Sequence, residues 1–438
     1  ATVSDTDSLK EVCQQYQESF DLENGPLIRF VKISYPLESK DRLFIVAHHL
    51  VIDGVSWRII LEDLEQLLSD TNYKLPEKQS SFRQWSTGLA EYTNSLSAEV
   101  KEYWQGISTD YKILKDLNTS PLSGKLETHS NILDQEITKS LSQDIHGKYG
   151  TELQDVLLGC LSSVLGNHYQ SSQVYIDVEG HGREEIISGL DISRTIGWFT
   201  SLYPLKLQVS EAIGVHLRDT KDMLREVPDD GLSYGALRYL SDTPDAYKYS
   251  KGGILFNYLG DFDGTVSEEG LLGFAGESTG DNISPFNQEG YGLLLTFMIS
   301  GGVLQMNWSY DQGMYSESEI SGLSEKYQSA LEAVIAHCKE STARVLSCSD
   351  CGLPSSVGNV ALDKFINECE TNYGAIESLY RLSPLQEGML FHSLYGGEGS
   401  GSYVSEFVCD FNGGINYDVF VKVWESIVSR HGILRTGI

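Results

Sequence analysis

Residues 41–57, DRLFIVAHHLVIDGVSW, decide the fold of this chain. The run begins with consecutive apolar residues, which predict a buried strand that ends at two adjacent histidines, His48 and His49. Neighbouring side chains on a strand point to opposite faces, so only one of these histidines can face a given cavity. A histidine between the end of a strand and the start of a helix is well placed to act as a general base.

The residues that follow predict helices. Asp53 or Ser56 is the expected N-terminal cap of a helix within residues 53–70. The apolar residues of this helix recur at helical spacing, and they are Trp57, Ile60, Leu61, Leu64, Leu67 and Leu68. Residues 81–95 and 98–106 are typical of amphipathic surface helices with aromatic anchors.

A second cycle of helix and strands follows. Residues 152–169 predict a core helix with a broad apolar stripe. Residues 173–182 alternate as a strand, with Val174, Ile176 and Val178 on one face and Tyr175, Asp177 and Glu179 on the other. Further strands are expected at 203–209, 252–260, 291–300 and 302–311, and a closing helix at 316–338. The predicted fold class is α/β, with α and β layers arranged in two comparable lobes.

Composition excludes several classes of function. A formal charge of −30, from 62 acidic and 32 basic residues, argues against a nucleic-acid partner. No apolar stretch approaches 18 residues, so no membrane span is expected. Seven cysteines, an odd number spread along the chain, predict no disulfide framework and favour a reducing cytoplasm. Cys348 and Cys351 are interpreted as two loop thiols, and no metal site is expected.

The histidine motif carries a resemblance. The run HHLVIDG, from His48 to Gly54, resembles the HHxxxDG signature of the condensation superfamily of nonribosomal peptide synthetases, which is related to chloramphenicol acetyltransferase. The resemblance implies a two-lobed, V-shaped fold with a central channel. It also implies that His49 faces the channel and that Asp53 is structural, holding the loop through a salt bridge. His48 and Gly54 are expected in supporting positions. Membership alone leaves condensation, epimerization and cyclization open.

Three further stretches favour epimerization. Residues 179–184 (EGHGRE), 194–207 (RTIGWFTSLYPLKL) and 254–262 (ILFNYLGDF) resemble epimerization motifs in the expected order. The resemblance implies an isomerase that inverts Cα of an aminoacyl or peptidyl thioester. Without its motif, Glu179 would be interpreted as a solvated carboxylate at a strand end. The alternatives are a condensation or dual condensation/epimerization domain that uses the same histidine, or a docking module without activity.

The chemistry of epimerization assigns roles to these residues. Removing the weakly acidic Cα proton requires a base and groups that stabilise the enolate oxygen. His49 and Glu179 are the expected acid/base pair because they come from different lobes. Asn257 and Tyr258 are candidates for positioning the thioester or stabilising the enolate, although core packing is nearly as good an interpretation for Tyr258. His181 and Arg183 are given a supporting role at most, and Trp57 and Trp198 are expected to be core or channel walls.

The resemblance also implies the partners. The substrate is expected on the 4'-phosphopantetheine arm of an upstream peptidyl carrier protein, with no tightly bound cofactor. Adenylation and condensation domains of the same assembly line are the other expected partners.

The domain organisation is predicted in four parts. Residues 1–165 are the N-terminal lobe, 166–342 the C-terminal lobe, 343–373 a linker, and 374–438 the beginning of the next condensation domain. The last part carries a strand-like run at 403–411 and a helix at 417–432. The resemblance implies that an opening segment is missing before Ala1. Asp53 is therefore expected to lack its arginine partner, which Arg435 could replace only if the tail folded into the vacancy.

Overall fold

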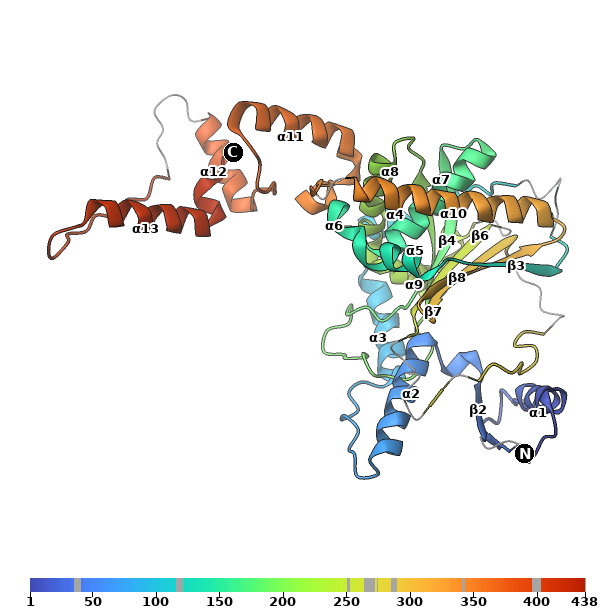
Figure 1. Cartoon of the computed structure of the whole chain (residues 1–438). Helices are drawn as coiled ribbons and strands as arrows, with labels where there is room; N and C mark the ends of the chain where they lie inside the picture. The colour runs from blue at the N-terminus through green and yellow to red at the C-terminus, as the bar shows by residue number, and fades with distance from the viewer. Residues whose placement is uncertain are drawn as a thin grey trace. The chain divides into compact units, whose positions relative to one another are not determined.

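The computed structural model describes residues 1–34, 41–115, 120, 122–249, 253–263, 272–273, 275–284, 290–340, 343–395 and 403–437. The chain forms two compact units, residues 1–379 and residues 380–438. The first unit contains both helices and strands (Figure 1), which confirms the predicted mixed α/β class. None of the helices among the described residues has the length and apolar character that crossing a membrane requires.

The first unit is built from the following elements. Its helices are α1 (Thr6–Glu18), α2 (Gly54–Ser69), α3 (Phe82–Ser95), α4 (Ala98–Asp110), α5 (Gln135–Lys139), α6 (His146–Tyr149), α7 (Leu153–Tyr169), α8 (Ile213–Arg225), α9 (Leu232–Leu240), α10 (Glu317–Lys339) and α11 (Asn359–Tyr373). Its strands are β1 (Ile28–Ile33), β2 (Arg42–Ala47), β3 (Leu126–Ile132), β4 (Gln173–Gly180), β5 (Ser201–Gln208), β6 (Ile254–Asp261), β7 (Leu293–Ser300) and β8 (Val303–Asp311).

Six of the strands form one sheet in the order β3-β8-β7-β6-β4-β5. Strand β6 runs parallel to both of its neighbours, and the other pairs are antiparallel. Helices α7, α8 and α10 pack together and against the sheet (Figure 1). Val174, Ile176 and Val178 of β4 belong to this core and are fully buried. Tyr175 and Asp177 on the other predicted face are buried as well, so burial does not alternate along the strand.

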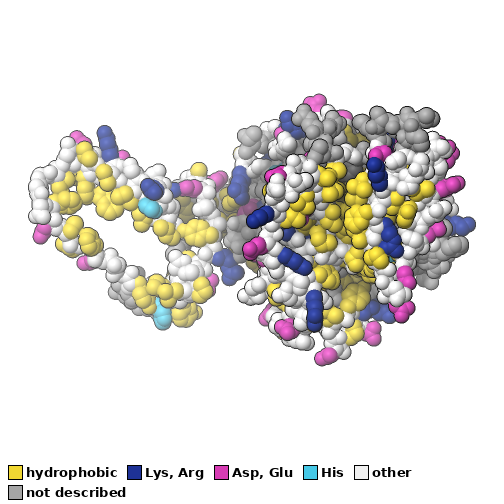
Figure 2. All heavy atoms as spheres, turned by 90° about the horizontal axis from the view of Figure 1, so that it is seen from below, with side chains coloured by type: hydrophobic (Ala, Val, Ile, Leu, Met, Phe, Trp, Pro, Cys, Tyr) yellow, Lys and Arg dark blue, Asp and Glu magenta, His cyan; other side chains and the backbone are white. Residues whose placement is uncertain are grey.

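A separate sheet of two antiparallel strands, β1 and β2, carries the residues that lead to the histidine motif. Helix α1 covers one face, where Val31 and Ile33 pack with Leu9. On the opposite face Phe30 is 64% exposed and Leu43 is 51% exposed. Seen from below, the surface of the first unit presents a group of hydrophobic side chains (Figure 2). The prediction of a buried strand at this place is therefore wrong, because only one face of the small sheet is covered.

The two sheets do not divide the chain at the predicted boundary between the lobes. Strand β3, which belongs to the predicted N-terminal lobe, pairs with β8 at the edge of the larger sheet. The predicted boundary between residues 165 and 166 falls inside α7. Neither β1 nor β3 was expected from the sequence.

Helix α2 begins as predicted but buries a different face. Asp53 is its N-cap, and its carboxylate accepts a hydrogen bond from the backbone N–H of Ser56. The buried side chains of the helix are Ser56 and Ile59, whereas Leu67 and Leu68 of the predicted apolar stripe are exposed. The apolar spacing predicted the wrong buried face of α2. Hydrogen bonds hold the start of the helix, and apolar periodicity does not detect them.

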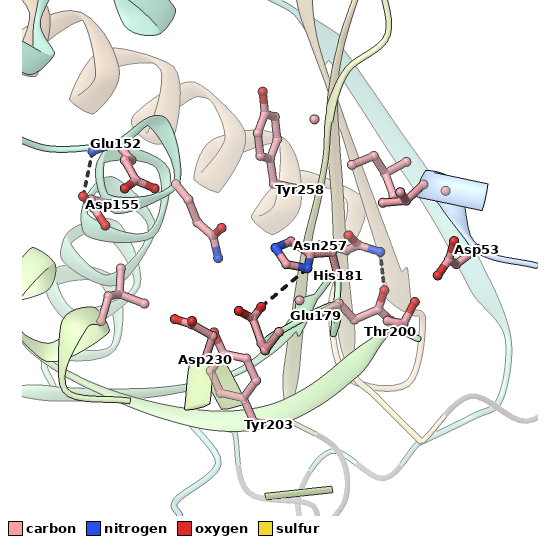
Figure 3. A pocket seen from close by; sticks show the side chains of 18 of the residues that line it. Asp53, Glu152, Asp155, Glu179, His181, Thr200, Tyr203, Asp230, Asn257 and Tyr258 are labelled. Atoms are coloured by element: carbon pink, nitrogen blue, oxygen red, sulfur yellow. Dashed lines mark hydrogen bonds and ion pairs between the residues drawn. The ribbon is translucent and has the colours of Figure 1, made fainter. Parts of the chain in front are cut away.

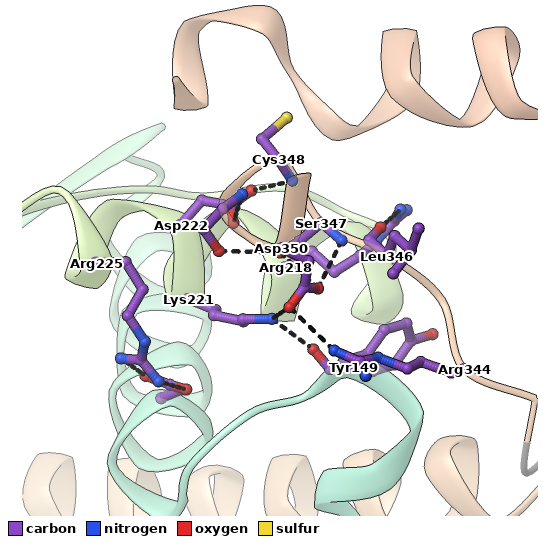
Figure 4. A network of polar contacts seen from close by, with 12 residues as sticks. Tyr149, Arg218, Lys221, Asp222, Arg225, Arg344, Leu346, Ser347, Cys348 and Asp350 are labelled. Atoms are coloured by element: carbon purple, nitrogen blue, oxygen red, sulfur yellow. Dashed lines mark hydrogen bonds and ion pairs between the residues drawn. The ribbon is translucent and has the colours of Figure 1, made fainter. Parts of the chain in front are cut away.

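The segment predicted as a linker, residues 343–373, is packed onto α8. Lys221, only 5% exposed, forms an ion pair of 2.8 Å with Asp350 (Figure 4). Arg218, 4% exposed, forms two hydrogen bonds of 2.6 and 2.7 Å with Asp363 of α11. The linker prediction is wrong for most of this segment. The small, polar composition of the segment does not reveal that Asp350 and Asp363 form ion pairs with buried side chains of α8.

The buried Lys221–Asp350 pair predicts how the segment is held. We expect Asp350→Asn to destabilise the docked segment by about 3 kcal/mol, because it leaves a buried ammonium without its carboxylate. Amide hydrogen exchange of residues 344–363 measures the change. Although burial opposes it, Lys221 and the backbone N–H of Ser347 hold the pKa of Asp350 below its usual 3.8. The contribution of the ionised Asp350 to stability is therefore complete above pH 3.8 and is lost as the pH falls further.

Arg344→Met is the matched control, since Arg344 pairs with the same carboxylate but is 62% exposed. An exposed pair contributes little. Equal protection of the segment in both variants would contradict the role assigned to Lys221.

The second unit contains α12 (Pro384–Tyr395) and α13 (Tyr417–Arg430). The helix predicted at 417–432 is confirmed. Residues 403–411, predicted as strand-like, have no regular structure. A lone extended segment needs a neighbouring strand for its backbone hydrogen bonds, and the described residues of this unit offer none.

Candidate active site

A buried ion pair joins the histidine loop to the motif that contains Glu179. The Asp53 side chain is 4% exposed, and its two oxygens lie 3.1 and 3.2 Å from Nη2 of Arg183, which is 6% exposed. Asp53 also accepts the backbone N–H of Phe199 at 3.1 Å and that of Ser56 at 2.7 Å. The carboxylate thereby ties α2, the EGHGRE segment and the loop before β5 together.

The expectation that Asp53 lacks its arginine is wrong. Arg183 supplies the partner, and its other terminal nitrogen donates to the carbonyl oxygens of Ile192 and Thr195 at 2.9 and 2.8 Å. Arg435 lies in the second unit, where it donates to the carbonyl oxygen of Ser429 at 2.8 Å. The sequence could not reveal the pair, because Arg183 is distant along the chain and only folding brings it to Asp53.

The two histidines have different surroundings. His49 begins a short 3₁₀ turn, His49–Val51, lines the cavity described below, and lies with its ring centroid 5.3 Å from that of Trp198. Nδ1 of His48 accepts the backbone N–H of Leu50 at 3.2 Å, and its ring stands edge-on to Phe20. His48 is not among the cavity-lining residues, in agreement with the alternation of neighbouring side chains.

Glu179 and Asn257 are held next to each other by the parallel pairing of β4 and β6. The register places these two residues directly opposite one another. Their side chains therefore project from the same face of the sheet. The amide Nδ2 of Asn257 donates to the Glu179 carboxylate (Figure 3). Asn257 thus orients the carboxylate.

A cavity of about 590 Å³ brings most of the predicted residues together. The predicted residues that line it are His49, Asp53, Gly54, Glu179, Asn257 and Tyr258. Tyr258 also packs against the core, which supports the core-packing interpretation, and its function in positioning or stabilising the substrate stays a prediction. Burial and the Asp261 carboxylate raise the pKa of Tyr258 to about 12, whereas Arg58 acts in the opposite direction.

Charged residues that the sequence did not single out complete the cavity wall. Arg225 is paired with Glu152 at 3.1 Å and with Asp155 at 3.0 Å. On another part of the wall Glu184 stands beside Asp230, and Oε1 of Glu184 lies 3.5 Å from Nδ1 of His181. Glu184 is part of the EGHGRE motif, but its partner Asp230 is remote in sequence, so the pairing had no local signal.

The pKa of Glu184 is unusually high for a carboxyl group. Burial, and then the negative charge of Asp230, raise the pKa of Glu184 from 4.5 to about 7. A carboxyl group with such a pKa can hold or release a proton near neutral pH. Glu184 is therefore a further titratable carboxyl group on the cavity wall.

The raised pKa of Glu184 predicts a pH-dependent effect on stability. The folded state holds the proton more tightly than the unfolded state, so the stability it contributes is complete below pH 4.5 and is lost as the pH rises through 7. We expect Glu184→Gln to raise the free energy of unfolding by roughly 2 kcal/mol at pH 8 and to change it little at pH 5. Urea unfolding at the two pH values measures the difference.

Glu185→Gln, at the exposed neighbouring position, is the control. An effect of Glu184→Gln that is the same at both pH values would show that Glu184 is ionised throughout.

The fold and the cavity define the class of protein. The condensation domain family matches residues 1–352, and the chain belongs to that family, which is a component of nonribosomal peptide synthetases. A linear gramicidin synthase of Brevibacillus parabrevis is 37% identical over 444 residues, which cover 98% of this chain and 9% of that protein. Gramicidin S synthase 1 of Brevibacillus brevis is 35% identical over 363 residues, covering 77% of this chain and 33% of that protein.

Solved structures of condensation and epimerization domains are also similar to this chain. The epimerization domain from the third module of tyrocidine synthetase B is 31% identical, with a TM-score of 0.68 over 77% of this chain and 78% of that chain. The condensation domain of the Monacolin K polyketide synthase is 19% identical, with a TM-score of 0.59 over 76% of this chain and 78% of that chain, and shares the fold. The chain spans less than a tenth of the linear gramicidin synthases that it matches.

Proposed function

We propose that the first unit epimerizes Cα of an aminoacyl or peptidyl thioester from L to D. The observation that carries the proposal is the meeting of His49 and the Asn257-bound Glu179 in one cavity. The 31% identity to an epimerization domain supports it. The substrate arrives on the phosphopantetheine arm of a peptidyl carrier protein, which fits the assembly-line character of the relatives.

The reaction needs two proton transfers and no net change in composition. One group takes the Cα proton, and the bonding electron pair moves into the carbonyl to form an enolate. A protonated group on the opposite face then gives a proton to Cα, and the carbonyl re-forms. His49 and Glu179 are the proposed pair, since they come from separate elements on the cavity wall. Asn257 positions Glu179 by donating to its carboxylate.

Condensation is the second candidate. The matched family is the condensation domain family, and His49 belongs to the motif that condensation shares. In that reaction the amine of a second carrier-bound substrate attacks the thioester, and a new amide bond forms. It assigns no function to the Glu179–Asn257 pair, which is why epimerization is preferred.

Solvent exchange separates the two reactions. In deuterated water the chain is expected to place deuterium at Cα of an L-phenylalanyl thioester on a phosphopantetheinylated carrier protein and to yield a D/L mixture. Glu179→Gln should lower the exchange rate by about 10²–10⁴-fold, because one of the two proton-transfer groups is lost. Mass spectrometry and chiral analysis of the released amino acid provide the measurement.

Glu185→Gln serves again as control, since it removes a carboxylate next to the same motif at an exposed position. A dipeptide that forms without Cα exchange would refute epimerization. Normal exchange by Glu179→Gln would remove Glu179 from the mechanism.

A further inference from the structure

Arg58, four residues into α2, lies on the cavity wall with its guanidinium across from the end of β6. Its Nη2 donates to the carbonyl oxygen of Leu259 at 2.8 Å, and its Cζ lies 4.9 Å from the ring centroid of Phe262. Arg58 therefore connects the helix that follows His49 to the strand that carries Asn257.

The backbone of β6 leaves room for this guanidinium. Gly260 has a φ of +90°, and a Cβ added there would lie 2.7 Å from Nη2 of Arg58. A side chain at this position would be strained by the left-handed backbone and would collide with the arginine. The close approach of the guanidinium thus depends on this glycine.

Arg58 differs from the other arginines at the site in its pairing. Arg183 is paired with Asp53, and Arg225 with Glu152 and Asp155. Among the described residues no ion pair involves Arg58, and its buried Nε–H has no hydrogen-bond acceptor. The cavity wall therefore carries a positive charge at Arg58, while Glu179, Glu184 and Asp230 supply negative charge.

On the basis of the proposed function, we infer that Arg58 is the cation that stabilises the enolate oxygen formed from the thioester. Arg58 contacts β6 at Leu259, two residues beyond the position that holds the Glu179 carboxylate. In the proposed reaction the carboxylate that Asn257 holds exchanges a proton with Cα, and the guanidinium on the same cavity wall stabilises the oxygen.

The charge of Arg58 acts on neighbouring groups in the expected direction. It opposes the increase in the pKa of Tyr258 that burial and Asp261 produce. A cation that favours negative charge on a neighbouring oxygen also favours it on an enolate.

Replacing Arg58 by a shorter, neutral polar side chain provides the test. We expect Arg58→Gln in the 438-residue chain to lower the rate of Cα deuterium exchange on the L-phenylalanyl carrier protein by about 10²–10³-fold. The KM for the carrier protein should stay within about threefold. Arg58→Lys should retain at least a tenth of the wild-type rate, because the charge is kept, and added guanidinium should partly restore Arg58→Gln.

Arg194→Met is the matched control. Arg194 is paired with Glu62 and Asp63 on the outer part of α2 and does not line the cavity, so this variant loosens α2 without removing the cavity charge. Its exchange rate should stay near that of wild type.

Two outcomes would overturn the assignment in different ways. If wild type exchanges and folded Arg58→Gln exchanges within twofold of it, Arg58 has no such function and epimerization stands. If wild type shows no exchange and forms amide bonds instead, the proposed function and the enolate assignment fail together.

Discussion

The buried pair of Asp53 and Arg183 is the interaction on which the site depends. Both side chains are nearly inaccessible, and each also makes hydrogen bonds to backbone groups of other segments. Removing one partner of such a pair leaves an uncompensated charge and typically costs about 3–5 kcal/mol. The pair therefore restricts the histidine loop and the EGHGRE segment to one relative arrangement.

That arrangement explains why chemically distinct groups meet in one cavity. His49 follows a small, half-exposed sheet, whereas Glu179 lies near the end of β4, an inner strand of the six-stranded sheet. Asp53 lies four residues after His49, and Arg183 lies four residues after Glu179. The ion pair thus joins the two segments at positions that have the same spacing from the two proposed proton-transfer groups, His49 and Glu179.

Local patterns predicted much of the fold. The strand β4, the core helix α7 and the cap at Asp53 were all available from neighbouring residues. The apolar stripe of α2 was misleading because the face that carries Ser56 is buried, where the Ser56 hydroxyl donates to the Gly197 carbonyl and accepts the Gly197 N–H. The docking of residues 343–373 was missed because it depends on Lys221 and Arg218, which belong to a different helix.

At the site too, short motifs were predicted from the sequence, whereas contacts between remote segments were not. The motifs identified His49, Glu179 and Asn257, and the cavity contains all three. Two further features depend on contacts between remote segments. They are the pairing of Asp53 with Arg183 and the closeness of Asp230 to Glu184. Single-sequence patterns record periodicity and short motifs, so contacts of this kind have no signal in them. The catalytic functions of these residues stay predictions.

The most direct measurement of the central claim is a double-mutant cycle between Asp53→Asn and Arg183→Met, with the rate of Cα deuterium exchange as the readout. If the pair holds His49 and Glu179 in one arrangement, each single variant slows exchange strongly and the double variant is no slower than the worse single variant. If the two losses multiply, or if either single variant exchanges at the wild-type rate, the pair does not organise the site.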